Sequence, residues 1–88
     1  MKCQLVGFNS VAYEKNGSDH SLCELHFVRS PFSSEKTFQG NVTKKFVVFD
    51  KVADSLPDLI IGGLYSVEVE ASGKYENLVE MALISTPK

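Results

Sequence analysis

The sequence has few cysteines, only one arginine and no long apolar run. Its two cysteines, Cys3 and Cys23, form no Cys-x-x-Cys pair, and His20 and His26 lie at no zinc-ligand spacing from them. We therefore expect two buried, reduced thiols and no metal site. Charged residues interrupt the apolar stretches every few positions, which argues against a membrane-spanning helix, and the N-terminal apolar run is too short for a secretion signal. These absences predict a cytoplasmic protein with no membrane contact.

Motifs for catalysis or cofactor binding are also missing. The sequence contains no P-loop, no Gly-x-Gly-x-x-Gly and no Gly-x-Ser-x-Gly. Glu24 precedes His26 by two residues on the same face of a predicted strand, which is more typical of a surface pair than of a catalytic dyad. We expect no enzymatic activity and no cofactor.

The composition is that of a small globular protein with an uneven charge distribution. The 88 residues, 43% of them hydrophobic and 23% charged, predict a single domain over residues 1–88 with a thin core. The net charge is −2. However, residues 35–51 contain four lysines and two acids, whereas residues 52–88 contain two lysines and six acids. A weakly basic region on an acidic protein can still follow a phosphate backbone locally.

The sequence pattern predicts five β-strands. The segment KCQLVGFNSVAYE (2–14) alternates with a slip at Gly7, which is typical of a bulge, and Asn16-Gly17 is a strong hairpin signal. SLCELHFVR (21–29) is the return strand, with Cys23, Leu25 and Phe27 on the face expected to point inward. After a polar loop, VTKKFVVFD (42–50) is rich in β-branched and aromatic residues. Two further strands form a hairpin around ASGKYEN (71–77).

One short helix is expected between the third and fourth strands, near residues 50–56. Asp50 is a candidate N-cap, and Pro57 limits the helix to about two turns. This order predicts an all-β protein, a five-stranded OB-fold-like Greek-key barrel with one short helix between strands 3 and 4. An SH3-like barrel is the nearest alternative.

Single-stranded nucleic acid is bound by positive charge together with aromatic rings on which bases stack. An OB-fold presents such a groove on its second and third strands, flanked by the first and last hairpin loops. For the third strand, the pattern leaves open whether Val47 and Phe49 or Lys44 and Phe46 face outward. Candidate nucleic-acid-binding residues are therefore taken from both strands and both loops: Tyr13, Lys15, His26, Lys44, Phe46, Lys74 and Tyr75.

The segments NGSDHSLCELHFV (16–28) and GLYSVEVEASGKYENLVEMALISTPK (63–88) resemble the single-stranded DNA-binding, helix-destabilising (gene V) proteins of filamentous phages. The resemblance covers chain length, strand order, the Gly-Leu-Tyr before the fourth strand, the aromatic-bearing last hairpin and the Pro-Lys ending. It implies an OB-fold homodimer that coats single strands cooperatively and without sequence preference. It assigns the hairpin aromatic to Tyr75, the strand-two position to His26 or Phe27, and a basic first-hairpin position to Lys15 alone. The sequence departs from the family in having fewer basic residues in the first hairpin.

The leading hypothesis is therefore a sequence-independent single-stranded DNA-binding protein of a phage or mobile element, active in DNA replication as a homodimer. Single-stranded RNA is an open alternative ligand. The competing hypothesis is a small β-barrel protein-interaction module, such as a phage structural or assembly adaptor, without nucleic-acid binding. The acidic isoelectric point and the single arginine, Arg29, favour this second interpretation.

Overall fold

The computed structural model describes residues 1–30 and 32–87, and for Tyr75 it describes the backbone only. Five strands and one short helix follow each other along the chain: β1 (Lys2–Lys15), β2 (Ser18–Arg29), β3 (Val42–Phe49), α1 (Asp50–Asp54), β4 (Leu64–Ser72) and β5 (Tyr75–Ser85). The five strands confirm the all-β prediction. The helix lies between β3 and β4, as expected.

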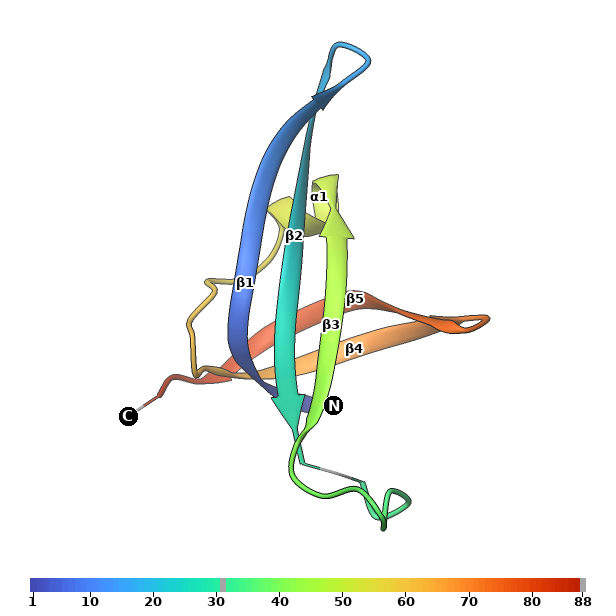
Figure 1. Cartoon of the computed structure of the whole chain (residues 1–88). Helices are drawn as coiled ribbons and strands as arrows, with labels where there is room; N and C mark the ends of the chain where they lie inside the picture. The colour runs from blue at the N-terminus through green and yellow to red at the C-terminus, as the bar shows by residue number, and fades with distance from the viewer. Residues whose placement is uncertain (31, 88) are drawn as a thin grey trace.

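All five strands belong to one antiparallel sheet in the order β3-β2-β1-β4-β5. β1 pairs with β2 over most of its length but with β4 only through Lys2, Cys3 and Gln4. The β1–β2–β3 sheet and the β4–β5 hairpin therefore cross at a steep angle, as Figure 1 shows. β3 and β5 form the two edges and do not pair with each other, so the sheet is open.

Two local signals in the sequence produce the features they predict. The β1–β2 register shifts between Leu5 and Gly7, where the bulge was expected. Asn16 (φ 53°) and Gly17 (φ 78°) both have positive φ at the two-residue turn, as a type I′ hairpin requires. One cap prediction is wrong: Phe49, with extended φ and ψ, is the N-cap of α1, and Asp50 is its first helical residue.

The core lies on the inner face of the sheet, between the β1–β2–β3 layer and the β4–β5 hairpin. Cys23, Leu25 and Phe27 are each at most 2% exposed, which confirms the predicted inward face of β2. Tyr65 of β4 is fully buried, and its hydroxyl donates to the Asp58 carbonyl and accepts from the Ile60 amide. This pair of hydrogen bonds fixes the connection between α1 and β4 to the core.

The described part of the chain contains no helix that is long and apolar enough to cross a membrane.

Candidate nucleic-acid interface

The residues opposite to the core form an exposed face on β1, β2 and β3. Directly paired residues of an antiparallel sheet lie on the same side of it. Since Leu25 and Phe46 are a buried pair, the alternate pairs point away from the core. These alternate positions define what we call the outer face: Val11, Tyr13, His20, Leu22, Glu24, His26, Lys45, Val47 and Phe49.

One end of the outer face is aromatic and apolar. Phe49 is 51% exposed, and it pairs across the sheet with Leu22, which in turn pairs with Val11. Val47, two residues along β3, is 42% exposed. An exposed phenylalanine with apolar neighbours on an otherwise regular strand offers a flat surface on which a planar ligand can stack.

A stacked pair of rings lies between this apolar end and the first hairpin. The Tyr13 and His20 rings stack at a centroid distance of 5.4 Å and an interplanar angle of 21°. His20 Nδ1 also lies 3.1 Å from Asp50 Oδ1, and the same oxygen accepts the Ser21 backbone N–H at 3.2 Å. The Ser21 amide and His20 lower the pKa of Asp50. These contacts fix the ring pair to the start of α1.

The middle of the outer face is polar. Glu24 Oε1 lies 2.6 Å from His26 Nε2 and 3.4 Å from Lys45 Nζ. The His26 hydrogen bond, helped by Lys45, lowers the pKa of Glu24. Lys45 remains 58% exposed, so it can also contact an external phosphate. The middle of the outer face thus adds one exposed lysine to the rings, and Lys15, which pairs with Ser18 on the same side of the sheet, lies at its hairpin end.

The structure separates the predicted binding residues into groups. Tyr13 and His26 lie on the outer face, six β2 pairing positions apart, which is about 20 Å at the rise of a β-strand. Lys15 and Lys74 are exposed at the ends of two hairpins that project in different directions (Figure 1). The side chain of Tyr75 lies outside the described part of the structure, so its predicted role stays a prediction.

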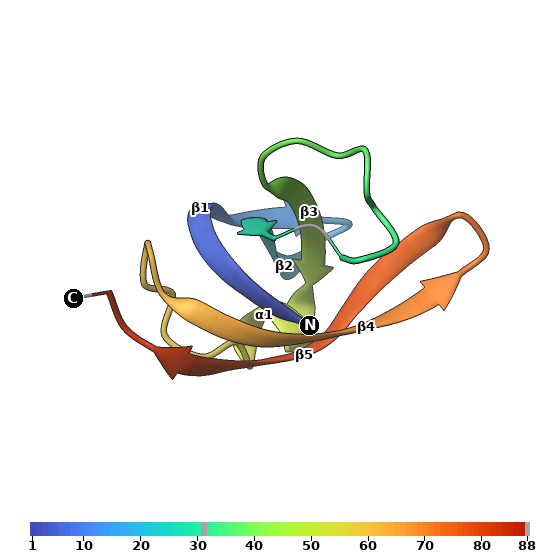
Figure 2. The same ribbon diagram turned by 90° about the horizontal axis from the view of Figure 1, so that it is seen from below.

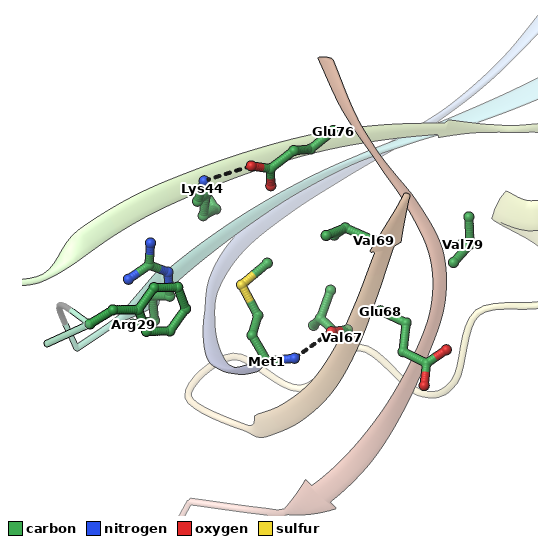
Figure 3. A pocket seen from close by; sticks show the side chains of 9 residues that line it. Met1, Arg29, Lys44, Val67, Glu68, Val69, Glu76 and Val79 are labelled. Atoms are coloured by element: carbon green, nitrogen blue, oxygen red, sulfur yellow. Dashed lines mark hydrogen bonds and ion pairs between the residues drawn. The ribbon is translucent and has the colours of Figure 1, made fainter. Parts of the chain in front are cut away.

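Two predicted residues of β3 face the other side of the sheet. Phe46 is 5% exposed and packs in the core, with its ring 6.1 Å from that of Phe27, so it cannot stack on a base and this assignment is wrong. Lys44 lies on the same inner face, next to a cleft, and its Nζ is 3.5 Å from Glu76 Oε1 on β5 (Figure 3). Of the two alternatives left open by the sequence, the structure has Phe46 inward and Phe49 outward.

The outer face also contains three residues that were not among the predicted binding residues: Phe49, Lys45 and His20. A count along β3 contains the signal: Val42, Phe46 and Val48 put three apolar residues on one side, against two on the other. Because the more apolar side of a half-exposed strand faces the core, the count favours the observed orientation. For His20 the signal is the two-residue Asn16-Gly17 turn, which fixes the hairpin register and thereby pairs His20 with Tyr13.

Comparison with protein-family models, with curated proteins and with solved structures finds no match to this chain.

Proposed function

We propose that this protein binds single-stranded nucleic acid, in the first place DNA, through the outer face of β1, β2 and β3. The observation that carries the proposal is the exposed ring of Phe49, which shares this face with the Tyr13–His20 ring pair. Bases stack on such rings without sequence preference, each contributing about 1–3 kcal/mol. Lys45 provides a phosphate contact beside them.

The proposal includes the finer fold assignment, an OB-like Greek-key barrel that is open along one seam. The OB-fold is partly open and binds oligonucleotides on its strand 2–3 face. Three features support the assignment: β1 pairs on both sides, the helix lies between β3 and β4, and β3 and β5 form the two free edges. Only hydrogen bonding between β3 and β5 is missing for closure.

The charges predict moderate and salt-sensitive affinity. Lys45 shares its positive charge with Glu24, and Asp50 lies beside His20. The number of phosphates neutralised is therefore small, and each contributes a slope of about −0.7 to the dependence of log affinity on log salt for single strands. Stacking supplies the larger part of the binding free energy in this account.

The biological setting follows from the resemblance to helix-destabilising phage proteins: a homodimer in the replication of a phage or mobile element. Apolar residues exposed on β5 support the homodimer. Val79 and Ile84 are 47% and 46% exposed, and a second subunit would cover them. In this setting Lys74 and Tyr75 of the projecting β4–β5 hairpin are proposed to contact the strand or the second subunit.

The test is a fluorescence-anisotropy titration of labelled oligothymidine at two salt concentrations. We expect saturable binding at low salt that weakens as salt rises. The slope of log affinity against log salt should correspond to about one or two phosphate contacts. Binding that does not change with salt, or no binding at low salt, would overturn the proposal.

A protein-interaction module is the second candidate, and the open edges favour it. β3 and β5 each present one edge without a strand partner in the described residues, and such edges can accept an extended peptide. Failure of oligothymidine binding together with a peptide partner that protects the β3 amides from hydrogen exchange would establish this function instead.

A further inference from the structure

A cleft on the inner side of the molecule lies apart from the outer face. It occupies the open seam between β3 and the β4–β5 hairpin, with a volume of about 470 Å³. Figure 2 shows the seam from below, and Figure 3 shows the cleft and its lining side chains. Apolar and charged side chains line it in nearly equal parts: Met1, Arg29, Phe32, Lys44, Val67, Glu68, Val69, Glu76 and Val79. Its volume lies in the range of sites for small molecules.

Arg29, at one end of the cleft, is a buried cation with an unused donor. The residue is 8% exposed, and its guanidinium lies 3.8 Å from the centroid of the Phe32 ring. Its Nη atoms donate to Glu35 at 2.8 and 3.4 Å and to the Ser30 carbonyl at 3.1 Å. Among the residues that the structure describes, Nε, by contrast, has no hydrogen-bond partner. A buried N–H without an acceptor is unfavourable, and an acceptor atom from a ligand would relieve this cost.

Lys44 is a second cation on the same wall. Arg29 pairs with Val42, two residues from Lys44, so the two cations are diagonal neighbours on the inner face. The Lys44 side chain is only 26% exposed, and its ammonium contacts Glu76 from the opposite wall. Because this is a single contact at 3.5 Å, a ligand anion can compete with Glu76 for Lys44.

Apart from Glu68, the remaining lining is apolar and can adapt. Val69 is the exposed apolar residue of the β4 wall, since Val67 is only 1% exposed, and Figure 3 shows the Met1 side chain extending between Arg29 and Val69. Methionine side chains are flexible and refill irregular spaces at low cost. A ligand can therefore reach the Arg29 end by displacing the Met1 side chain without moving a strand.

We propose that this cleft binds an amphiphilic organic anion, with its apolar body against Val69 and the Met1 side chain and its anionic group between Arg29 Nε and Lys44. Glu76 is then an internal competitor for the same cation. The acids Glu68 and Glu76 disfavour ligands with several negative charges, so a single carboxylate or sulfonate on an apolar body fits best. This site is independent of the nucleic-acid interface, which lies on the opposite face of β3.

The experiment uses a matched pair of fluorescent probes on the full chain. 1-Anilinonaphthalene-8-sulfonate carries one sulfonate on an apolar aromatic body, and N-phenyl-1-naphthylamine is the same body without the anion. We expect Lys44→Gln to weaken sulfonate-probe binding at least fivefold and Glu76→Gln to tighten it at least twofold. Neither variant should change binding of the neutral probe more than twofold. Lys45→Gln, the neighbour on the outer face, should change binding of neither probe.

Three results would overturn the proposal. Equal losses for Lys44→Gln and Lys45→Gln would mean that the probe responds only to overall charge. Weaker binding in Glu76→Gln would mean that the ion pair builds the site rather than competes for it. Displacement of the sulfonate probe by oligothymidine would make the cleft part of the nucleic-acid surface. Since Glu76→Gln leaves both cations in place, it keeps the proposal testable even if Lys44→Gln does not fold.

Discussion

Asp50 combines a strained backbone with a carboxylate that contacts two residues of β2. Its φ of 48° lies in the left-handed region, which aspartate tolerates better than most residues. Its carboxylate accepts from the Ser21 backbone N–H and contacts His20. These contacts hold the β3–α1 junction against β2. We infer that they stabilise a conformation that the residue would otherwise adopt only at a cost.

The first prediction concerns the pH dependence of this junction. The Ser21 and His20 contacts lower the pKa of Asp50 in the folded protein. The Asp50 carboxylate therefore makes its full contribution to the free energy of unfolding above the unfolded pKa of about 3.9. The contribution is lost as the pH falls through the lowered folded pKa. Asn can keep the left-handed φ and the Ser21 hydrogen bond but has no charge. The melting temperature of Asp50→Asn should therefore lie below that of the wild type at pH 7, with the gap narrowing as the pH falls below about 3.9. A gap that stays constant from pH 7 to pH 3 would contradict this account.

The second prediction separates the two phenylalanines of β3. Phe46→Ala removes a core ring and should lower the free energy of unfolding by about 3–5 kcal/mol. Phe49→Ala, on the exposed side, should lower it by less than about 1 kcal/mol. Urea denaturation monitored by circular dichroism measures both values. Similar losses for the two variants would mean that the outer face of β3 is covered in solution.

At the scale of elements, the β4–β5 hairpin carries an unfavourable charge pair. Glu68 pairs directly with Glu80 across the two strands, and both are exposed. Like charges at directly opposite positions destabilise a sheet by a few tenths of a kcal/mol up to about 1 kcal/mol.

The third prediction follows from this charge pair. Glu80→Lys converts the repulsion into an attraction and should raise the free energy of unfolding by about 0.5–1 kcal/mol at low salt, and by less at 1 M salt. Glu70→Lys, which faces Asn77 instead, is the matched control and should gain less. If Glu80→Lys lowers the free energy of unfolding instead, the Glu68 and Glu80 carboxylates make a stabilising contact with another molecule.

The elements themselves were largely predictable from the sequence. Asn16-Gly17 and Gly7 act through local backbone geometry, so the first hairpin and its bulge could be read directly. The side of β3 that faces the core was harder to assign, since each side carries one lysine and the apolar residues differ only by three to two. Whether the sheet closes into a barrel could not be predicted either, because β3–β5 pairing depends on residues distant in sequence. The predicted base-stacking role of Phe46 was wrong because the orientation of β3 was left open. A one-residue shift exchanges the two faces of a strand.

The whole molecule is more extended than its length requires. Its Cα radius of gyration is 14.3 Å, whereas a compact chain of this length is expected at about 12 Å. Both hairpins project beyond the packed centre in Figure 1, and the exposed Val79 and Ile84 lie on β5. Projecting strands with exposed apolar residues commonly find a partner in a second subunit.

The fourth prediction is therefore a homodimer in solution. Light scattering at high protein concentration should give twice the mass of the 88-residue chain. Val79→Lys should shift the equilibrium toward the monomer, because it places a charge in the apolar contact. A monomer mass for the wild type at every concentration would refute the dimer.

The central claim is that the outer face of the β1–β2–β3 sheet binds single strands, and two equally exposed phenylalanines test it. Phe49 is 51% exposed on the outer face, and Phe32 is 52% exposed beside the cleft. The measurement is the oligothymidine affinity of Phe49→Ala and Phe32→Ala at one low salt concentration, with melting temperatures to verify folding. We expect a loss of about 1–3 kcal/mol of binding free energy for Phe49→Ala and of less than about 0.5 kcal/mol for Phe32→Ala. The reverse pattern, with Phe49→Ala at wild-type affinity, would contradict it.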